Sequence, residues 1–257
     1  MNMNMYEAIF SRKSIRHYKN EAIEWEVLSD ILQFADELPK LIDDIAIEFK
    51  LVSNIEKKQG FHGPFTVKAP YYICISSEMK DDYLINAGYM MEQISLYITS
   101  MGLGTCFLGG ADPGKGLKDT MRYNYVISLA FGKPTGDLYR DSHDAKRLDE
   151  DALVVYKEDV DSDVRQMITA ARLAPSSLNN QPWRFVVYKN RIHIFTRKNV
   201  ALYKVMDSSN KIDIGVMLAN LLIAAEELWI DVSISKLESL KSKDFKNNQY
   251  VLTMVIG

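Results

Sequence analysis

Two segments far apart in the chain have nearly the same sequence, and this repeat limits the possible folds more than any other feature. Residues 125–132 read YVISLAFG and residues 250–257 read YVLTMVIG, at an offset of 125 residues. Both runs are rich in β-branched and apolar residues, which is typical of strands buried in a sheet. The fold must therefore accommodate the same strand twice.

A second pair of similar segments has the pattern of a helix. Residues 87–103 (AGYMMEQISLYITSMGL) match residues 214–230 (IGVMLANLLIAAEELWI), with Gly88 against Gly215 at an offset of 127. Each segment is apolar almost all round at helical spacing. We therefore expect two helices that are each buried on both sides.

A third pair precedes these helices in the chain. Residues 28–39 (LSDILQFADELP) match residues 164–175 (VRQMITAARLAP), with Pro39 against Pro175 at an offset of 136. Similar helix and strand patterns also arise in unrelated segments. Three pairs in the same order nevertheless indicate an internal duplication.

The repeats divide the chain into two similar half-domains. We expect a first half at residues 1–135, a linker at 136–159 and a second half at 160–257. Helices and strands alternate in both halves, which favours an α+β fold over an all-helical bundle. Two similar halves most naturally pack their buried helices about a pseudo-two-fold axis, as the subunits of a homodimer do.

Composition and charge exclude several classes of function. The 257 residues are 47% hydrophobic and 25% charged, which is typical of globular proteins. A net charge of −3 gives no basic surface for nucleic acid. Cys74 and Cys106 lack the spacing of a disulfide framework, and the histidines lack the spacing of metal ligands. With no signal-peptide core and no membrane-spanning run, the sequence predicts a cytoplasmic protein without a metal or a membrane partner.

A basic segment near the N-terminus has the residue types of a phosphate site. In SRKSIRHY (11–18), Arg12, Ser14 and Arg16 alternate, so an extended backbone places them on one face. Two planar guanidiniums and a hydroxyl suit a phosphate group. On its own, this pattern is also that of a solvated charged edge.

A second segment has the residue types of a site for a flat polar ring. In RLAPSSLNNQPWRF (172–185), an apolar helix is expected to end before Pro175, and Ser176, Ser177, Asn179 and Gln181 follow. Several small donors and acceptors on a rigid loop could read the edge of a ring. The alternative is an ordinary helix-to-strand connection, since serine and asparagine are common turn residues.

Together with GLGTCFLGG (102–110), these two segments resemble three characteristic stretches of the FMN-dependent nitroreductase family. The resemblance implies the α+β fold of that family. In its common form, two subunits intertwine and bind an FMN at each of two equivalent interface sites. The basic segment comes from one subunit and the serine–asparagine loop comes from the other.

This chain divides those motifs between its halves. The first half has SRKSIRHY, but ELPKLIDD (37–44) stands where the loop would follow its helix. The second half has APSSLNNQPW, but an acidic VYKEDVDSDV (155–164) precedes its helix. The chain thus resembles a fused, pseudo-dimeric branch of the family. This implies one FMN per chain and a monomer that mimics a homodimer.

The resemblance also implies which residues contact FMN. Arg12, Lys13, Ser14 and Arg16 are expected at the phosphate and ribityl chain, with Lys146 and Arg147 as a late basic pair. The flavin ring is expected to meet the backbone at Gly109 and Gly110 and the loop residues Pro175, Ser176, Ser177 and Asn179. Gln181 and Trp183 are expected to buttress this loop.

The implied activity is electron transfer from NAD(P)H, through FMN, to a small acceptor such as a nitroaromatic or a quinone. The flavin supplies the difficult chemistry, so no residue is assigned as an acid–base catalyst. One alternative is other flavin chemistry on the same fold, such as dehalogenation or azoline-type oxidation. Another is a flavin-binding protein without catalytic activity.

Overall fold

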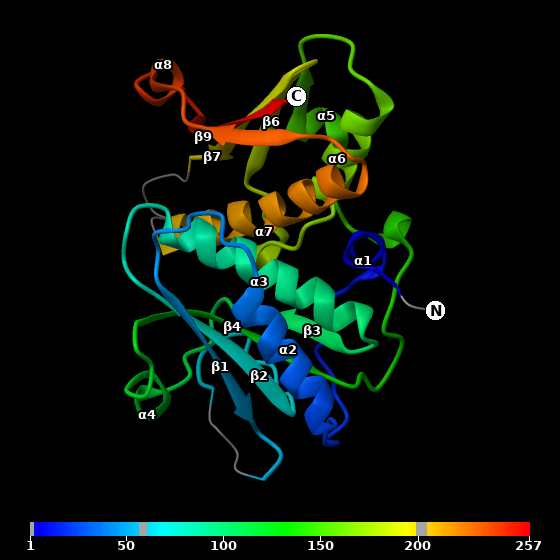
Figure 1. Ribbon diagram of the computed structural model, residues 1–257, viewed down its shortest axis with the longest axis vertical. Coiled ribbons are helices and arrows are strands. Elements are labelled where there is room, and N and C mark those ends of the chain that lie inside the picture. Colours follow the sequence, from blue (N-terminus) through cyan, green and yellow to red (C-terminus); the bar gives the residue numbers. More distant parts are fainter. Residues whose placement is uncertain (1–2, 57–60, 199–204) are drawn as a thin grey trace. The chain divides into compact units, whose positions relative to one another are not determined.

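The computed structural model describes residues 3–56, 61–198 and 205–257, and it divides into two compact units, Met1–Asp144 and Ala145–Gly257 (Figure 1). Each unit contains a sheet with helices on it, so the expected α+β class is confirmed. Residues 136–159, the expected linker, contain the 3₁₀ turn η1 (Ser142–Asp144), the short helix α5 (Glu150–Leu153) and the strand β5 (Val154–Tyr156).

The first unit is built on a four-stranded antiparallel sheet in the order β1-β2-β4-β3. Its strands are β1 (Ile47–Ser53), β2 (Tyr71–Ser77), β3 (Gly104–Phe107) and β4 (Asn124–Gly132). Its helices are α1 (Met5–Ser11), α2 (Trp25–Glu37), α3 (Tyr83–Ser100) and α4 (Lys115–Lys118).

Helix α3 is buried along almost its whole length, as its uniformly apolar sequence predicts. It ends at Ser100, and Gly102, just beyond the end, has a φ of +83° in the left-handed region that favours glycine; the amides of Gly102 and Leu103 donate to the carbonyls of Thr99 and Ile98. Phe34 of α2 stacks on Tyr97 of α3 with 3.9 Å between ring centroids. Helices α1, α2 and α3 thus form one packed layer in this unit.

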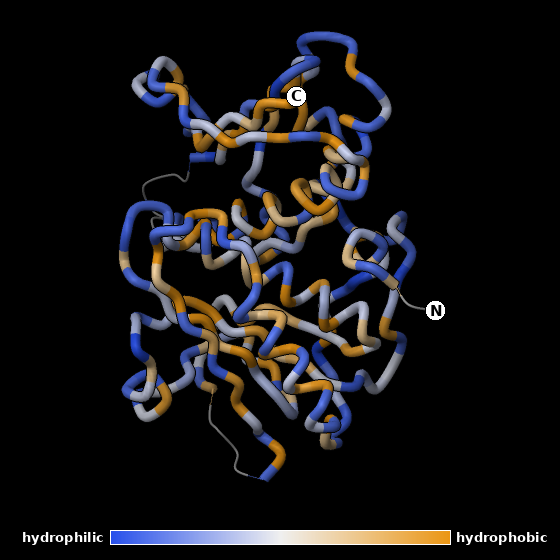
Figure 2. Tube along the Cα trace, in the orientation of Figure 1, coloured by the Kyte–Doolittle hydropathy of each residue, from blue (hydrophilic) through white to orange (hydrophobic). Residues whose placement is uncertain are grey.

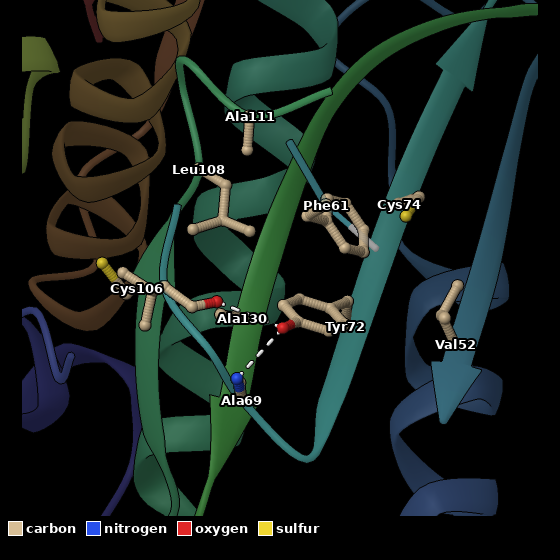
Figure 3. Packing of buried hydrophobic residues seen from close by; sticks show 10 residues of the cluster. Val52, Phe61, Ala69, Tyr72, Cys74, Cys106, Leu108, Ala111 and Ala130 are labelled. Carbon is tan, nitrogen blue, oxygen red and sulfur yellow. Dashed lines mark hydrogen bonds between the residues drawn. The ribbon is translucent and has the colours of Figure 1, made fainter. Parts of the chain in front are cut away.

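The first unit also has a compact apolar cluster in which sheet side chains meet loop side chains (Figure 3). Tyr72, Cys106 and Ala130 come from the sheet, and Phe61 and Leu108 come from the loops that follow β1 and β3. The Tyr72 hydroxyl donates to the Val67 carbonyl at 3.1 Å and accepts from the Ala69 amide at 3.0 Å. This packing fixes the start of the turn after β3.

The second unit is built on a five-stranded sheet in the order β5-β6-β7-β9-β8. Strands β6 (Trp183–Tyr188), β7 (Arg191–Arg197), β8 (Val232–Ser235) and β9 (Asn248–Ile256) pair antiparallel, whereas β5 pairs parallel with β6. Its further helical elements are α6 (Ser162–Arg172), η2 (Ser177–Asn179), α7 (Val205–Glu227) and α8 (Glu238–Lys241).

Each pair of similar sequences adopts the same type of element in the two units. The helices α2 and α6, the long helices α3 and α7, and the strands β4 and β9 correspond. Strand β4 lies between β2 and β3, just as β9 lies between β7 and β8. Figure 2 shows apolar residues along both long helices, and α7 is buried on nearly every face from Asp213 to Ala225, as expected. The duplication itself stays a prediction.

Candidate functional site

The basic segment lies along the edge of the first unit's sheet. Helix α1 ends at Ser11, and the next residues are extended, beginning with Arg12 at φ −63° and ψ 144°. Ser14 pairs in parallel with Thr105 of β3, and the Ile15 amide donates to the Thr105 carbonyl at 2.8 Å. A Cβ on Gly104 would lie 2.6 Å from the Ile15 side chain, so glycine is what allows this close approach.

Arg12 is a buried cation with an unsatisfied nitrogen. Its side chain is 1% exposed, and its Nη2 donates to the Ser14 hydroxyl at 3.4 Å. Its buried Nε has no hydrogen-bond partner among the described residues. Because a buried guanidinium without an anionic partner is costly, this arrangement is what an anion-binding site requires.

Arg140 is a half-buried arginine that also has an unsatisfied buried nitrogen, and sequence analysis missed it. Tyr139 forms a bridge with Arg12, and the Arg140 amide donates to the Ser11 carbonyl at 2.9 Å. Burial, and next the charge of Arg12, lower the pKa of Arg140, whereas Asp144 opposes this shift. The buried Nε of Arg140 also has no partner among the described residues. A lone arginine in a polar segment has no periodic pattern, so only a search for a third cation could have found it.

Arg16 is exposed and Lys13 is half-buried. Burial raises the pKa of the Cys106 thiol, and the charges of Arg16 and Arg12 oppose that rise. Both arginines also act on Tyr18, whose pKa burial raises. Arg12 and Arg16 therefore both place positive charge near Cys106, as expected for alternate residues of an extended segment.

The predicted glycine pair forms an exposed turn after β3. The Leu108 amide donates to the Ser128 carbonyl at 2.9 Å, and Gly109 and Gly110 follow. A Cβ on Gly110 would lie 2.9 Å from the Pro64 carbonyl oxygen. Close backbone packing within the unit is therefore one reason for glycine at residue 110.

The loop after α6 in the second unit has an unusual backbone. Leu178, Asn179 and Gln181 have φ values of 51°, 56° and 47°, in the left-handed region that non-glycine residues seldom adopt. The Gln181 amide donates to the Ser176 hydroxyl at 3.0 Å. Backbone strain of this kind persists only where the surroundings hold it, and it is concentrated at functional sites.

The late basic pair lies against this loop. Arg147 donates from Nη1 to the Asn179 side chain at 3.2 Å and from Nη2 to the Leu173 carbonyl at 2.7 Å. The Asn179 amide nitrogen donates to the Lys146 carbonyl at 2.9 Å. Arg147 and Asn179 thus fasten the loop to the preceding segment.

Gln181 and Trp183 have the supporting position expected of them. The Gln181 side chain accepts from the Leu148 amide at 2.9 Å and donates to the Asn179 carbonyl at 3.1 Å. The Trp183 ring is fully buried at the start of β6. Both residues connect the exposed part of the loop to the interior of the unit.

A buried carboxyl group holds the middle of the loop. Both side-chain oxygens of Asp213, on α7, accept from the Ser177 amide, at 3.0 and 3.1 Å. Asp213 is 6% exposed. Burial raises its pKa to about 7, and the hydrogen bond from Ser177 opposes this shift. Nothing in the sequence pattern distinguished this aspartate, because several other polar residues, such as Asn210 and Lys211, precede it in the same helix.

The structure brings the predicted residues together in two groups. The first unit has the basic segment and the glycine turn, and the second unit has the late basic pair and the serine–asparagine loop. In the described part of the chain, no set of three or more histidine, cysteine or acidic residues is arranged to hold a metal. None of the helices described has the length and apolar character needed to cross a membrane.

The two units define an α+β protein whose first unit holds two arginines, Arg12 and Arg140, with buried Nε atoms that lack a partner among the described residues. Residues 4–225 match the protein family described as "Putative TM nitroreductase". Since the match spans most of the chain, the chain belongs to this nitroreductase family and is an oxidoreductase by class. No curated protein gave a significant match.

The chain is similar to several solved structures. A putative nitroreductase from Thermotoga maritima has a TM-score of 0.68 and 20% sequence identity, with 100% of this chain and 95% of that chain covered. A nitroreductase family protein from Clostridium novyi NT has a TM-score of 0.46 and 23% identity, with 55% and 90% covered. A putative NADH dehydrogenase/NAD(P)H nitroreductase from Bacteroides thetaiotaomicron has a TM-score of 0.47 and 21% identity, with 60% and 98% covered. The Thermotoga maritima structure thus matches this chain over its whole length.

Proposed function

We propose that the protein binds FMN and transfers electrons from NAD(P)H to a small acceptor such as a nitroaromatic or a quinone. One observation carries the proposal. Arg12 and Arg140 each have a buried Nε without a partner among the described residues, and their charges act on each other. A phosphate monoester would supply the negative charge and the acceptor oxygens that these guanidiniums require.

The residues of the first unit fit the phosphate end of FMN. Arg12 and Arg140 would neutralise the phosphate, and Ser14 would accept or donate a hydrogen bond beside it. Arg16, which is exposed, would contribute charge from the solvent side, and Lys13 would contribute through its backbone. This assignment adds Arg140 to the residues predicted from sequence.

For the ring end of FMN, we propose the remaining candidates that the family resemblance implies. Ser176, Ser177 and the loop backbone would offer small polar groups to the ring edge, and Pro175 would contact its face or edge. The backbone at Gly109 and Gly110 would approach the ring. Lys146 and Arg147 would act mainly by holding Asn179 and the loop in position.

When bound, FMN supplies the two-electron chemistry, and the protein binds, orients and shields it. A nicotinamide donor is what the nitroreductase resemblance implies. No side chain is assigned a proton-transfer role.

Anaerobic titration of the purified full-length chain with NADH or NADPH tests the proposal. We expect the protein to purify yellow, and the visible absorbance to bleach with about one equivalent of donor per flavin. Reoxidation by a panel of nitroaromatics and quinones then identifies the acceptor class. A chain that binds no FMN overturns the proposal, and one whose flavin resists both donors is a binding protein without this activity.

A further inference from the structure

The long helix of each unit holds the loop that follows the preceding helix, and it does so from the same position. In the first unit, the Asn86 side-chain oxygen on α3 accepts from the amides of Leu41 at 3.0 Å and Ile42 at 3.1 Å. In the second unit, Asp213 on α7 accepts from the Ser177 amide with both oxygens. The sequence offsets of 127 and 136 pair Asn86 with Asp213 and Leu41 with Ser177.

We call each of these side-chain contacts, Asn86 with its loop and Asp213 with its loop, a tether. The two tethers differ in the charge of the side chain. The first unit uses a neutral amide to hold the loop ELPKLIDD, which lacks the serines and asparagine of its counterpart. The second unit uses a carboxyl group to hold the loop that has them. Because Asn86 is itself 0% exposed, an asparagine can perform the holding function in a buried environment. Holding the backbone is therefore not a sufficient reason for an ionisable group at residue 213.

We propose that Asp213 is the positioning residue of the 175–181 loop, and that its carboxylate form fixes the Ser177 amide for flavin binding while its protonated form loosens the loop. The predicted effect on flavin binding rests on the proposed function, whereas the hydrogen bond between Asp213 and the Ser177 amide does not depend on it. A carboxylate accepts a stronger hydrogen bond from a backbone amide than a neutral acid does. The strained backbone at Leu178 and Asn179 would relax when that bond weakens.

The charged groups around Asp213 leave it free to titrate. Lys211 on the same helix is exposed. On α6, which packs against α7, Arg165 pairs with Asp159 and Arg172 pairs with Glu150. Residues 175–181 contain no ionisable side chain. Burial and the Ser177 hydrogen bond are the influences that act on its pKa of about 7, so both forms are populated near neutral pH.

Stability and loop order should then respond to pH in opposite directions. The folded-state pKa of Asp213 lies above its ordinary value of 3.8, so the folded state takes up a proton that the unfolded state has lost. This contribution to stability is full below about pH 4 and is lost as the pH rises through about 7. Over the same pH range, the hydrogen bond from the Ser177 amide to the Asp213 carboxyl group strengthens as that group loses its proton.

The test compares the wild-type chain with Asp213→Asn and Asp213→Leu, with Asp163→Asn as an exposed control. In the flavin-free protein, NMR should show the Ser177 amide proton titrating together with the Asp213 carboxyl carbon. In Asp213→Asn the Ser177 titration should vanish, and the pH dependence of unfolding should flatten.

FMN binding is compared as the ratio of the wild-type affinity to the Asp213→Asn affinity. This ratio should fall about tenfold from pH 8 to pH 5.5, because Asp213 becomes protonated in the wild type. The ionisation of the phosphate itself affects both proteins equally and cancels in the ratio. Asp213→Leu should bind FMN weakly at every pH, and Asp163→Asn should match wild type.

A Ser177 amide that does not follow Asp213, or a ratio independent of pH, overturns the inference. If wild type binds no FMN at any pH while the Ser177 amide still titrates with Asp213, the proposed function fails and the tether stands. Asp213→Asn keeps the test decisive even if Asp213→Leu does not fold, since Asn86 already performs the same contact.

Discussion

At the scale of single residues, the most informative feature is a pair of arginines that repel each other without a compensating pair of acids. Arg12 is 1% exposed, and its charge lowers the pKa of Arg140. The charge of Asp144 acts on Arg140 in the opposite direction and is the weakest of the three influences on its pKa. Such an arrangement is unfavourable in the free protein and becomes favourable when an anion binds.

Arg140→Gln should therefore have effects of opposite sign on binding and on stability. FMN affinity should fall about 10- to 100-fold, because one charge-assisted hydrogen bond contributes about 1.5–3 kcal/mol. The flavin-free protein should become slightly more stable, because the repulsion with Arg12 is removed. Fluorescence titration and thermal unfolding measure the two effects, with the exposed Arg122→Gln as control. A loss of stability together with unchanged affinity would show that Arg140 is structural.

Arg16→Glu tests the exposed part of the same group. The substitution places a carboxylate near the phosphate, and FMN affinity should fall about tenfold or more. Because Arg16 is exposed, the loss should shrink as ionic strength rises and the Debye length falls below about 10 Å. Affinity measured at several salt concentrations checks this. A loss that does not depend on salt would contradict a charge effect.

At the scale of elements, the loop after α6 has three non-glycine residues in the left-handed region within four positions. Leu178 has a φ of 51° and is 68% exposed. Leu178→Gly should raise the free energy of unfolding by up to about 1 kcal/mol, since glycine adopts this φ without strain and little apolar contact is lost. Urea unfolding measures this, with Leu178→Ala as the control that retains the strain. A clear loss of stability in the glycine variant would mean that the leucine side chain packs against something when the protein is folded.

The elements with strong periodic patterns could be predicted from sequence, and those fixed by tertiary contacts could not. The apolar periodicity predicted α3 and α7, and the alternating runs predicted β4 and β9. The left-handed backbone at Leu178, Asn179 and Gln181 could not be predicted, because none of these residues is a glycine. Asp213 and Arg140 were missed for a related reason. Their roles depend on which backbone amide or which cation lies beside them, and spacing along the chain does not encode that.

At the scale of the whole molecule, we predict one FMN per chain in a functional monomer. The chain has a single basic segment and a single serine–asparagine loop, so it has one full set of the family's motifs. Light scattering combined with quantitation of released FMN measures both the mass and the stoichiometry. Two flavins per chain would contradict the one-site prediction, and activity found only in a dimer would contradict the monomer.

We propose that Arg12 and Arg140 of the first unit bind the flavin phosphate, and a comparison of FMN with riboflavin tests this contact. Riboflavin differs from FMN only in lacking the phosphate, so the ratio of their Kd values isolates that contact. The wild-type chain should prefer FMN by about 100-fold or more, since two guanidinium contacts each contribute about 1.5–3 kcal/mol. In Arg12→Gln the preference should fall by about tenfold or more, because one of the two contacts is lost, with riboflavin affinity unchanged. A wild-type chain that binds both ligands equally, or an Arg12→Gln chain that keeps the full preference, would contradict the account.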